Sequence, residues 1–115
     1  MFVDDATRLR PMRDAAAEAV RFVQGKTRAD LDKDRQLVLA LVKCIEIVGE
    51  AASGVSAALR ERHPDVPWRA IVAMRNRLIH GYYEIDLDRV WDTATANLLL
   101  LLATLERIIK VDGDS

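Results

Sequence analysis

The chain has 115 residues, of which half are hydrophobic and 30% are charged, and its formal net charge is -1 at pH 7. This length and balance predict a single domain, residues 1–115, and exclude a disordered chain or one coated with positive charge for nucleic acid or membrane surfaces. Cys44 is the only cysteine, which excludes an internal disulfide and a cluster of thiolate metal ligands.

Apolar residues recur at steps of three and four along most of the chain, which predicts an all-α fold, an antiparallel bundle of about five helices. The first helix is expected over about residues 6–24, ending at Gly25, although Pro11 predicts a later start or a bend. A short second helix is expected after Thr27, whose hydroxyl could cap it, with Asp30 at the third position beyond.

The predicted third helix is a long spine that should end before Pro64, because the residue before a proline is pushed out of helical geometry. Its apolar residues alternate steps of four and three over roughly 30 residues, or about 45 Å at 1.5 Å per residue. They are Leu37, Leu41, Cys44, Val48, Ala51, Val55 and Ala58. Gly49 and Gly54 interrupt the spine, each at a cost of up to about 1 kcal/mol against Ala. We therefore expect another backbone to approach closely there, either within the bundle or from a second subunit.

A fourth helix is expected to begin at Pro67 and to run toward His80. Asp86 is placed to cap a last helix that reaches about residue 110. The apolar residues of this last helix cover one broad face, and Leu99 and Leu100 fall outside that face. A helix that is apolar nearly all round needs cover on both sides, which indicates a homodimer.

No segment of the sequence predicts a membrane span or a secretion signal. The longest apolar stretch, Leu98–Ala103, is far below the roughly 18 residues required to cross a bilayer. The first residues lack a basic segment followed by an apolar run. We therefore expect a cytoplasmic protein.

The segment Arg75–Tyr83 concentrates the groups that can do chemistry. No acidic residue occurs from Val66 to Tyr83, so a local cationic patch lies on a nearly neutral protein, which suits a phosphate-bearing partner held at one place. His80 is the strongest candidate for a general acid or base, because an imidazole titrates near pH 6.5, at about neutrality. An arginine five residues earlier lies about 140° away on an ideal helix. Arg75 and His80 can therefore share a site only if the helix ends or loosens near His80, where Gly81 follows.

An arginine, a histidine and a phenol are sufficient groups for metal-free cleavage of RNA. Arg75 can hold a phosphate with paired donors, and His80 can exchange a proton with a ribose hydroxyl that attacks the neighbouring phosphodiester. One histidine cannot easily be base and acid at once, and a twofold dimer would supply the second. A metal site is not expected, because the two histidines are not at ligand spacing and no carboxylate cluster accompanies them.

The motif resembles that of a known ribonuclease group. Arg75 to His80 matches the R-x4-H signature of HEPN ribonucleases, and Tyr82 extends it to R-x4-H-x-Y. Further strings resemble the HepT-like toxin family (the DUF86 group), and the similarity runs from about residue 9 to residue 109. These strings are Ile47–Ala52, Pro67–Ile71, Met74–Asn76 and Ile79–Tyr82.

The resemblance implies a homodimeric, all-helical, HEPN-like endoribonuclease without cofactor or metal, the toxin of a type II/VII-like toxin–antitoxin pair. It implies that Arg75 and His80 of both subunits form one composite site for an RNA substrate. It also implies a partner, a nucleotidyltransferase antitoxin of the MNT type that transfers AMP to Tyr82. A bulky anionic group beside Arg75 would compete with an RNA phosphate.

Neighbouring residues allow both functional and structural interpretations. Asn76 could bind phosphate or orient His80, and Arg77 could extend the phosphate site, but both residues could equally be solvated. Glu50 could meet Arg75 across the bundle or be an ordinary exposed glutamate. The basic cluster Arg60, Arg62 and His63 is interpreted as a solvated helix end, and Trp68 and Trp91 as core or interface anchors.

Two further hypotheses compete with the ribonuclease. The chain could be a non-catalytic HEPN dimer that binds a nucleotide or its nucleotidyltransferase partner, with the motif as a phosphate-docking surface. It could also be a structural dimer without a ligand.

Overall fold

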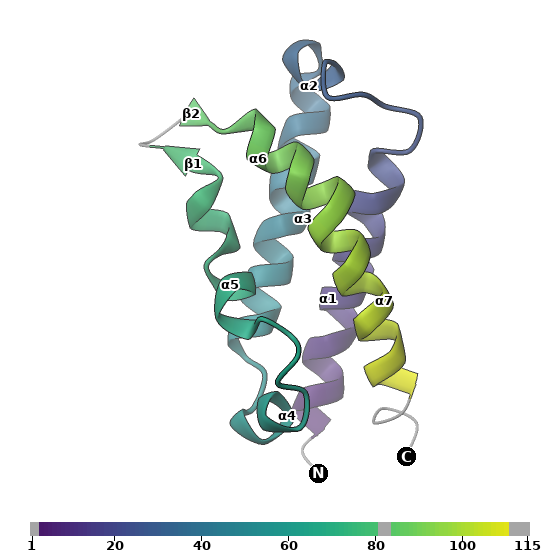
Figure 1. Ribbon diagram of the computed structural model, residues 1–115, viewed down its shortest axis with the longest axis vertical. Coiled ribbons are helices and arrows are strands. Elements are labelled where there is room, and N and C mark those ends of the chain that lie inside the picture. The colour runs from purple at the N-terminus through teal and green to yellow at the C-terminus, as the bar shows by residue number, and fades with distance from the viewer. Residues whose placement is uncertain (1–2, 81–83, 111–115) are drawn as a thin grey trace.

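The computed structural model describes the backbone of residues 3–80 and 84–110, and the side chains of residues 9–79 and 84–110. Its helices form an elongated antiparallel bundle with extents of 45 × 30 × 20 Å, as predicted (Figure 1). The long elements are α1 (Val3–Phe22), α3 (Arg35–Ser53) and a continuous helical rod made of α6 (Leu87–Asp92), η2 (Thr93–Asn97) and α7 (Leu98–Ile108). The shorter elements are α2 (Asp30–Lys33), α4 (Ala57–Arg62), α5 (Trp68–Val72) and η1 (Met74–Arg77).

Helix α1 packs against both α3 and α7 through a face of small residues and Met12. The alanines Ala15, Ala16 and Ala19 are buried on this face, so the three backbones can approach closely. The helix runs through Pro11 from Val3, so the later start predicted from this proline is wrong.

The turn after α1 agrees with the prediction at Gly25 and differs from it at Thr27. Gly25 has a φ of +73°, the left-handed conformation that a glycine at a helix end adopts at no steric cost. Half of the predicted cap is present, because the carboxylate of Asp30 accepts from the Thr27 amide at 2.7 Å. The Thr27 hydroxyl also donates to this carboxylate, at 3.4 Å, and does not cap the helix as predicted. The charge-assisted bond from the Thr27 amide lowers the pKa of Asp30 below its ordinary value.

The predicted spine is broken after α3. Gly54 ends that helix, and the hydroxyl of Ser56 accepts from the Leu59 amide at 3.1 Å to begin α4. A single helix reaching Ala58 is therefore wrong. The residues of the predicted apolar stripe are nevertheless buried up to Val55, which lies beyond the end of α3, whereas Ala58 is exposed.

Gly49 lies on α3 where the backbone of α5 approaches it closely. A Cβ at this position would lie 3.3 Å from the carbonyl oxygen of Ile71 and 3.4 Å from that of Val72. The predicted close approach is confirmed at Gly49, and the approaching backbone belongs to the same bundle.

Arg60 fixes the break between α3 and α4. Its guanidinium donates to the carbonyl oxygen of Ala52 at 2.7 Å and to that of Val55 at 3.3 Å. It also lies 6.0 Å from the ring centroid of Trp68, which is 6% exposed. The carbonyls at a helix end need partners outside the helix, and Arg60 supplies them. The interpretation of this arginine as a solvated helix end is wrong, whereas Trp68 is a core anchor as predicted.

The fourth helix is much shorter than predicted. Helix α5 ends at Val72 and the 3-10 turn η1 at Arg77, after which β1 (Ile79–His80) pairs antiparallel with β2 (Glu84–Ile85). Leu78, 1% exposed, anchors the pair, and its carbonyl accepts from the Asp86 amide at 2.6 Å. The helix does end before His80, which is the condition that a shared site with Arg75 requires.

The final helical rod begins as predicted, with the Asp86 carboxylate accepting from the Arg89 amide at 3.1 Å. Its middle, η2, is a π-helical segment, where the wider helical turn shifts which side chains face the core. Leu98 and Leu105 are fully buried, whereas Leu99 is 51% and Leu100 is 73% exposed. Among the described helices, none is long and apolar enough to cross a bilayer.

Candidate phosphate-binding site around Arg75

Arg75 is held at the surface of the bundle by an acid from another helix. Its Nε donates to Oε2 of Glu46 on α3 at 2.9 Å, and the two side chains are 51% and 30% exposed. Nζ of Lys43 lies 3.9 Å from the other carboxylate oxygen. Ion pairs this exposed contribute about 0–1 kcal/mol to stability, so the pair orients the guanidinium more than it stabilises the fold.

The sequence left two interpretations of Glu50 open, a contact with Arg75 or an ordinary exposed glutamate. The structure shows the exposed glutamate, and Glu46 is the acid that meets Arg75. The reason is the antiparallel register of α3 and α5. Gly49 faces Val72, so a residue three positions after Val72 lies beside the residue three positions before Gly49. Glu50 is exposed one turn further along α3.

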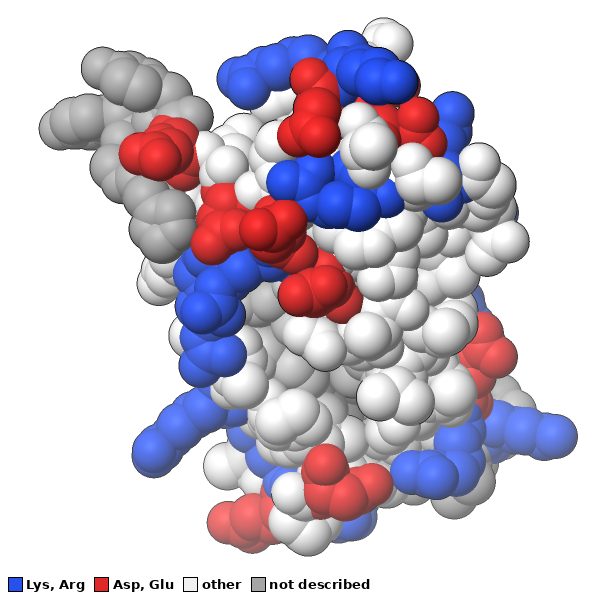
Figure 2. Space-filling model, turned by 45° about the horizontal axis from the view of Figure 1, so that its top comes forward, with Lys and Arg blue, Asp and Glu red and all other residues white. Residues whose placement is uncertain are grey.

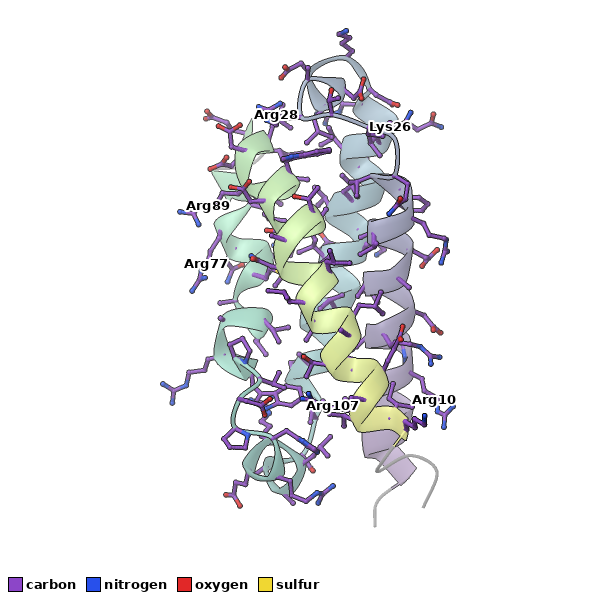
Figure 3. The ribbon with its side chains drawn as sticks, turned by 45° about the vertical axis from the view of Figure 1, so that its right-hand side comes forward. Arg10, Lys26, Arg28, Arg77, Arg89 and Arg107 are labelled. Carbon is purple, nitrogen blue, oxygen red and sulfur yellow. The ribbon has the colours of Figure 1, made fainter. Side chains whose placement is uncertain are left out.

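Asn76 and Arg77 follow Arg75 on η1, and both are exposed. Arg77 and Arg89 project to the same side of the molecule, away from the bundle (Figure 3). Arg89 is 59% exposed, and its Nε lies 3.8 Å from the Asp86 carboxylate. The sequence did not single out Arg89, because it lies outside the acid-free segment. Its position in the first turn after the Asp86 cap could have indicated that it lies near the end of the motif.

The cationic patch of the sequence is not isolated in the folded chain. Figure 2 shows acidic side chains next to basic side chains on this part of the surface. Glu46 on α3 and Glu84 on β2 come from outside the acid-free segment. Glu46 and Asp86 each lie beside one of the arginines, which reduces the positive potential there.

For His80, the structure gives the backbone alone. The backbone of His80 lies on β1, opposite Glu84 in the antiparallel pair and directly after the segment that carries Arg75. The side chain of His80 and the whole of Tyr82 lie outside the described residues. The convergence of imidazole, phenol and guanidinium thus stays a prediction.

Cys44 lies on α3, two positions before Glu46. Burial raises the pKa of the Cys44 thiol, which is 5% exposed, so this group is a neutral core residue and not a nucleophile. Within the part of the chain that the structure describes, no group of three or more potential ligands from His, Cys, Asp or Glu could hold a metal ion.

An apolar groove of about 410 Å³ lies beside the site, between α5–η1 and η2–α7. Ile71 and Met74 form one wall, and Leu100 and Leu101 form the other. Asn97 and Thr104 add polar groups. The exposed face of α7 therefore continues into a hollow that reaches the turn carrying Arg75.

Comparison with known proteins adds independent information. The sequence profile of the family described as "Ribonuclease HepT-like" matches residues 12–110. A protein of Thermococcus cleftensis named "Probable ribonuclease HepT" is 31% identical over 98 residues, which cover 82% of this chain and 89% of that protein. A "Putative RNase" of Caldanaerobacter subterraneus is 36% identical over 88 residues, which cover 76% of this chain and 75% of that protein.

A "Putative RNase" of Methanocaldococcus jannaschii is 29% identical over 93 residues, with 81% of this chain and 77% of that protein covered. No solved structure matches the chain significantly. The matches extend over α1 to α7, so the resemblance is not confined to the motif.

Proposed function

The chain belongs to the ribonuclease HepT-like family, and from this premise we propose that it is a metal-independent endoribonuclease and the toxin of a toxin–antitoxin pair. In this proposal Arg75 binds the scissile phosphate and His80 transfers protons. One observation carries the proposal. Arg75 is fixed at the surface by Glu46, one short turn before the strand on which His80 lies. The guanidinium of Arg75 on η1 and the strand β1 that carries His80 therefore lie on consecutive elements.

The proposed reaction uses the ribose of the substrate as its nucleophile. A neutral imidazole takes the proton of the 2′-hydroxyl, and the 2′-oxygen attacks the neighbouring phosphorus. The bond from phosphorus to the 5′-oxygen breaks, and an imidazolium returns a proton to that oxygen. The products are a 2′,3′-cyclic phosphate and a 5′-hydroxyl. Arg75 offsets the charge that develops on the non-bridging oxygens.

The proposed reaction needs two histidines, so two copies of the chain are required to form the site. A base and an acid are needed together, and a homodimer brings two His80 residues to one composite site. Exposed Leu99 and Leu100 support such an assembly, because a large apolar side chain gains about 1.5–3 kcal/mol on full burial. The groove beside Leu100 offers a hollow on the same face, which suits a self-complementary interface.

Regulation by a nucleotidyltransferase antitoxin of the MNT type is the second part of the proposal. Tyr82 follows His80 by two residues, so an AMP group on its hydroxyl would bring a phosphate close to the site and compete with RNA. Co-expression with such an enzyme should add the mass of AMP to the peptide that contains Tyr82. Tyr82→Phe should prevent the addition, and an unmodified wild-type peptide would remove this part of the proposal.

The activity itself is tested with purified protein and a mixed-sequence RNA. Wild-type protein should cut the RNA, and His80→Ala should lose about a hundredfold to ten-thousandfold in rate, the usual contribution of a general acid or base. Arg75→Ala should also cut the RNA more slowly than the wild-type protein. Wild-type protein that binds RNA or nucleotide but never cuts would instead support the non-catalytic module, in which Arg75 docks a phosphate.

A further inference from the structure

We propose that Glu46 is a positioning residue for the ribonuclease reaction: it turns the guanidinium of Arg75 so that the edge with both Nη groups faces the scissile phosphate. This inference rests on the proposed function and adds a residue to it. The sequence did not single out Glu46, and its role follows from the contact between α3 and η1.

The contact selects one edge of the guanidinium. Glu46 accepts from Nε of Arg75 at 2.9 Å, a short charge-assisted hydrogen bond. A guanidinium is a planar fork with five donors, and two parallel donors from one edge match a phosphate. Because Glu46 uses the Nε position, the edge formed by the two Nη groups remains oriented away from α3. Half of the Arg75 side chain is exposed, so this edge can meet a ligand.

The two partners differ in rigidity, which decides which one positions the other. Glu46 lies in the middle of the 19-residue helix α3, between the fully buried residues Ile45 and Val48. Arg75 lies on a 3-10 turn of four residues, whose side chains are not buried. A carboxylate on a packed helix is a fixed point, whereas an arginine on a short turn would otherwise sample many rotamers.

The charge of Glu46 distinguishes positioning from simple binding. Its carboxylate lowers the local positive potential, so removing it should leave RNA affinity unchanged or higher. The orientation of Arg75 in the transition state should be lost, and a misplaced catalytic group lowers the rate by up to about a hundredfold. Glu46→Ala should therefore lower kcat by about tenfold to a hundredfold without raising KM.

The conservative variant separates hydrogen bonding from charge. Glu46→Gln keeps an amide oxygen that can accept from Nε of Arg75, so it should recover most of the kcat that Glu46→Ala loses. Glu50→Ala is the matched control, because this glutamate is exposed on the next turn of α3. The hydroxyl of Ser53 donates to its backbone carbonyl at 2.6 Å, a bond that the substitution keeps. Glu50→Ala should keep the wild-type kcat and KM.

The decisive experiment is a double-mutant cycle in RNA cleavage, with thermal unfolding as a check on the fold. Glu46→Ala should cost nothing further in an Arg75→Ala background, because a positioning residue acts only through its partner. Wild-type kcat in Glu46→Ala would overturn the inference while leaving the ribonuclease intact. So would an equal loss in both backgrounds, or a Glu46→Gln protein that is folded but as slow as Glu46→Ala. A wild-type protein that cuts no RNA would overturn the proposed function, and the role of Glu46 with it.

Discussion

Gly49→Val should destabilise the bundle at the contact between α3 and α5. A Cβ at Gly49 would lie 3.3 Å from the Ile71 carbonyl oxygen and 3.4 Å from that of Val72. Valine adds two methyl groups beyond this Cβ, and the opposing atoms are backbone atoms that cannot rotate away. Forcing such carbons into a packed contact costs about 1–3 kcal/mol.

Helix propensity acts in the opposite direction and reduces the expected loss. Glycine costs about 1 kcal/mol in a helix against Ala, and valine costs roughly half of that. The net loss should be about 0.5–2.5 kcal/mol, or a fall in Tm of roughly 2–10 °C at about 4 °C per kcal/mol. Gly49→Ala should stay close to wild-type stability, because its propensity gain offsets a shift of a few tenths of an ångström.

Thermal unfolding followed by helical circular dichroism measures this difference. Glu50→Val is the control, because it places the same side chain on the neighbouring exposed position of α3. It should change stability by no more than about 0.5 kcal/mol, as surface substitutions usually do. A Gly49→Val protein as stable as Glu50→Val would refute the argument that a backbone contact requires this glycine.

Four other predictions follow from individual contacts. Arg60→Ala should lower the free energy of unfolding in urea by about 1–3 kcal/mol, because the carbonyls of Ala52 and Val55 lose a charged donor. Wild-type stability would contradict this. Leu100→Glu should shift the protein from dimer to monomer in sedimentation and lower RNA cleavage; an active dimer would place the interface on another face. Arg77→Ala should reduce the salt slope of binding to a non-cleavable single strand by about 0.7, whereas Arg107→Ala, a solvent-exposed control, should not; equal slopes would remove Arg77 from the site. The hydrogen bond from Thr27 to the Asp30 carboxylate contributes stability that is present above the pKa of Asp30 in the unfolded chain. This stability is lost as the pH falls through the pKa of Asp30 in the folded chain, which lies below 3.8. Asp30→Asn should therefore reduce the loss of stability at acid pH, and an unchanged loss would contradict the assignment.

Local chemistry predicted the features of the fold that depend on one or two residues. Gly25 at the end of α1 and Asp86 at the start of α6 act through their own backbone or side chain, so neighbouring residues are sufficient to identify them. The break after α3 was missed because the apolar spacing continues across it, with Val55 buried beyond the end of the helix. The pair of β1 and β2 was missed because two-residue strands have no periodicity to detect.

The sequence predicts which segment carries the candidate site, but it does not predict which residues of other helices contact that segment. Arg75 and His80 were predicted as site residues because their side-chain chemistry is specific and their spacing matches a motif, and this assignment stays a prediction. Glu46 and Arg60 were missed as partners because each contact depends on how two helices are aligned, and spacing along one segment does not give that alignment. The close approach at Gly49 was the available signal, since it sets the register that brings Glu46 to Arg75.

Cleavage of an RNA that carries a 2′-O-methyl group at the preferred cleavage position tests the central claim most directly. Wild-type protein should cut the unmodified strand in the presence of EDTA and leave a 2′,3′-cyclic phosphate. It should not cut the modified strand at that position, because the attacking oxygen no longer carries a proton that His80 can remove. Cleavage at the methylated nucleotide, with the same rate and position, would contradict attack by the ribose hydroxyl.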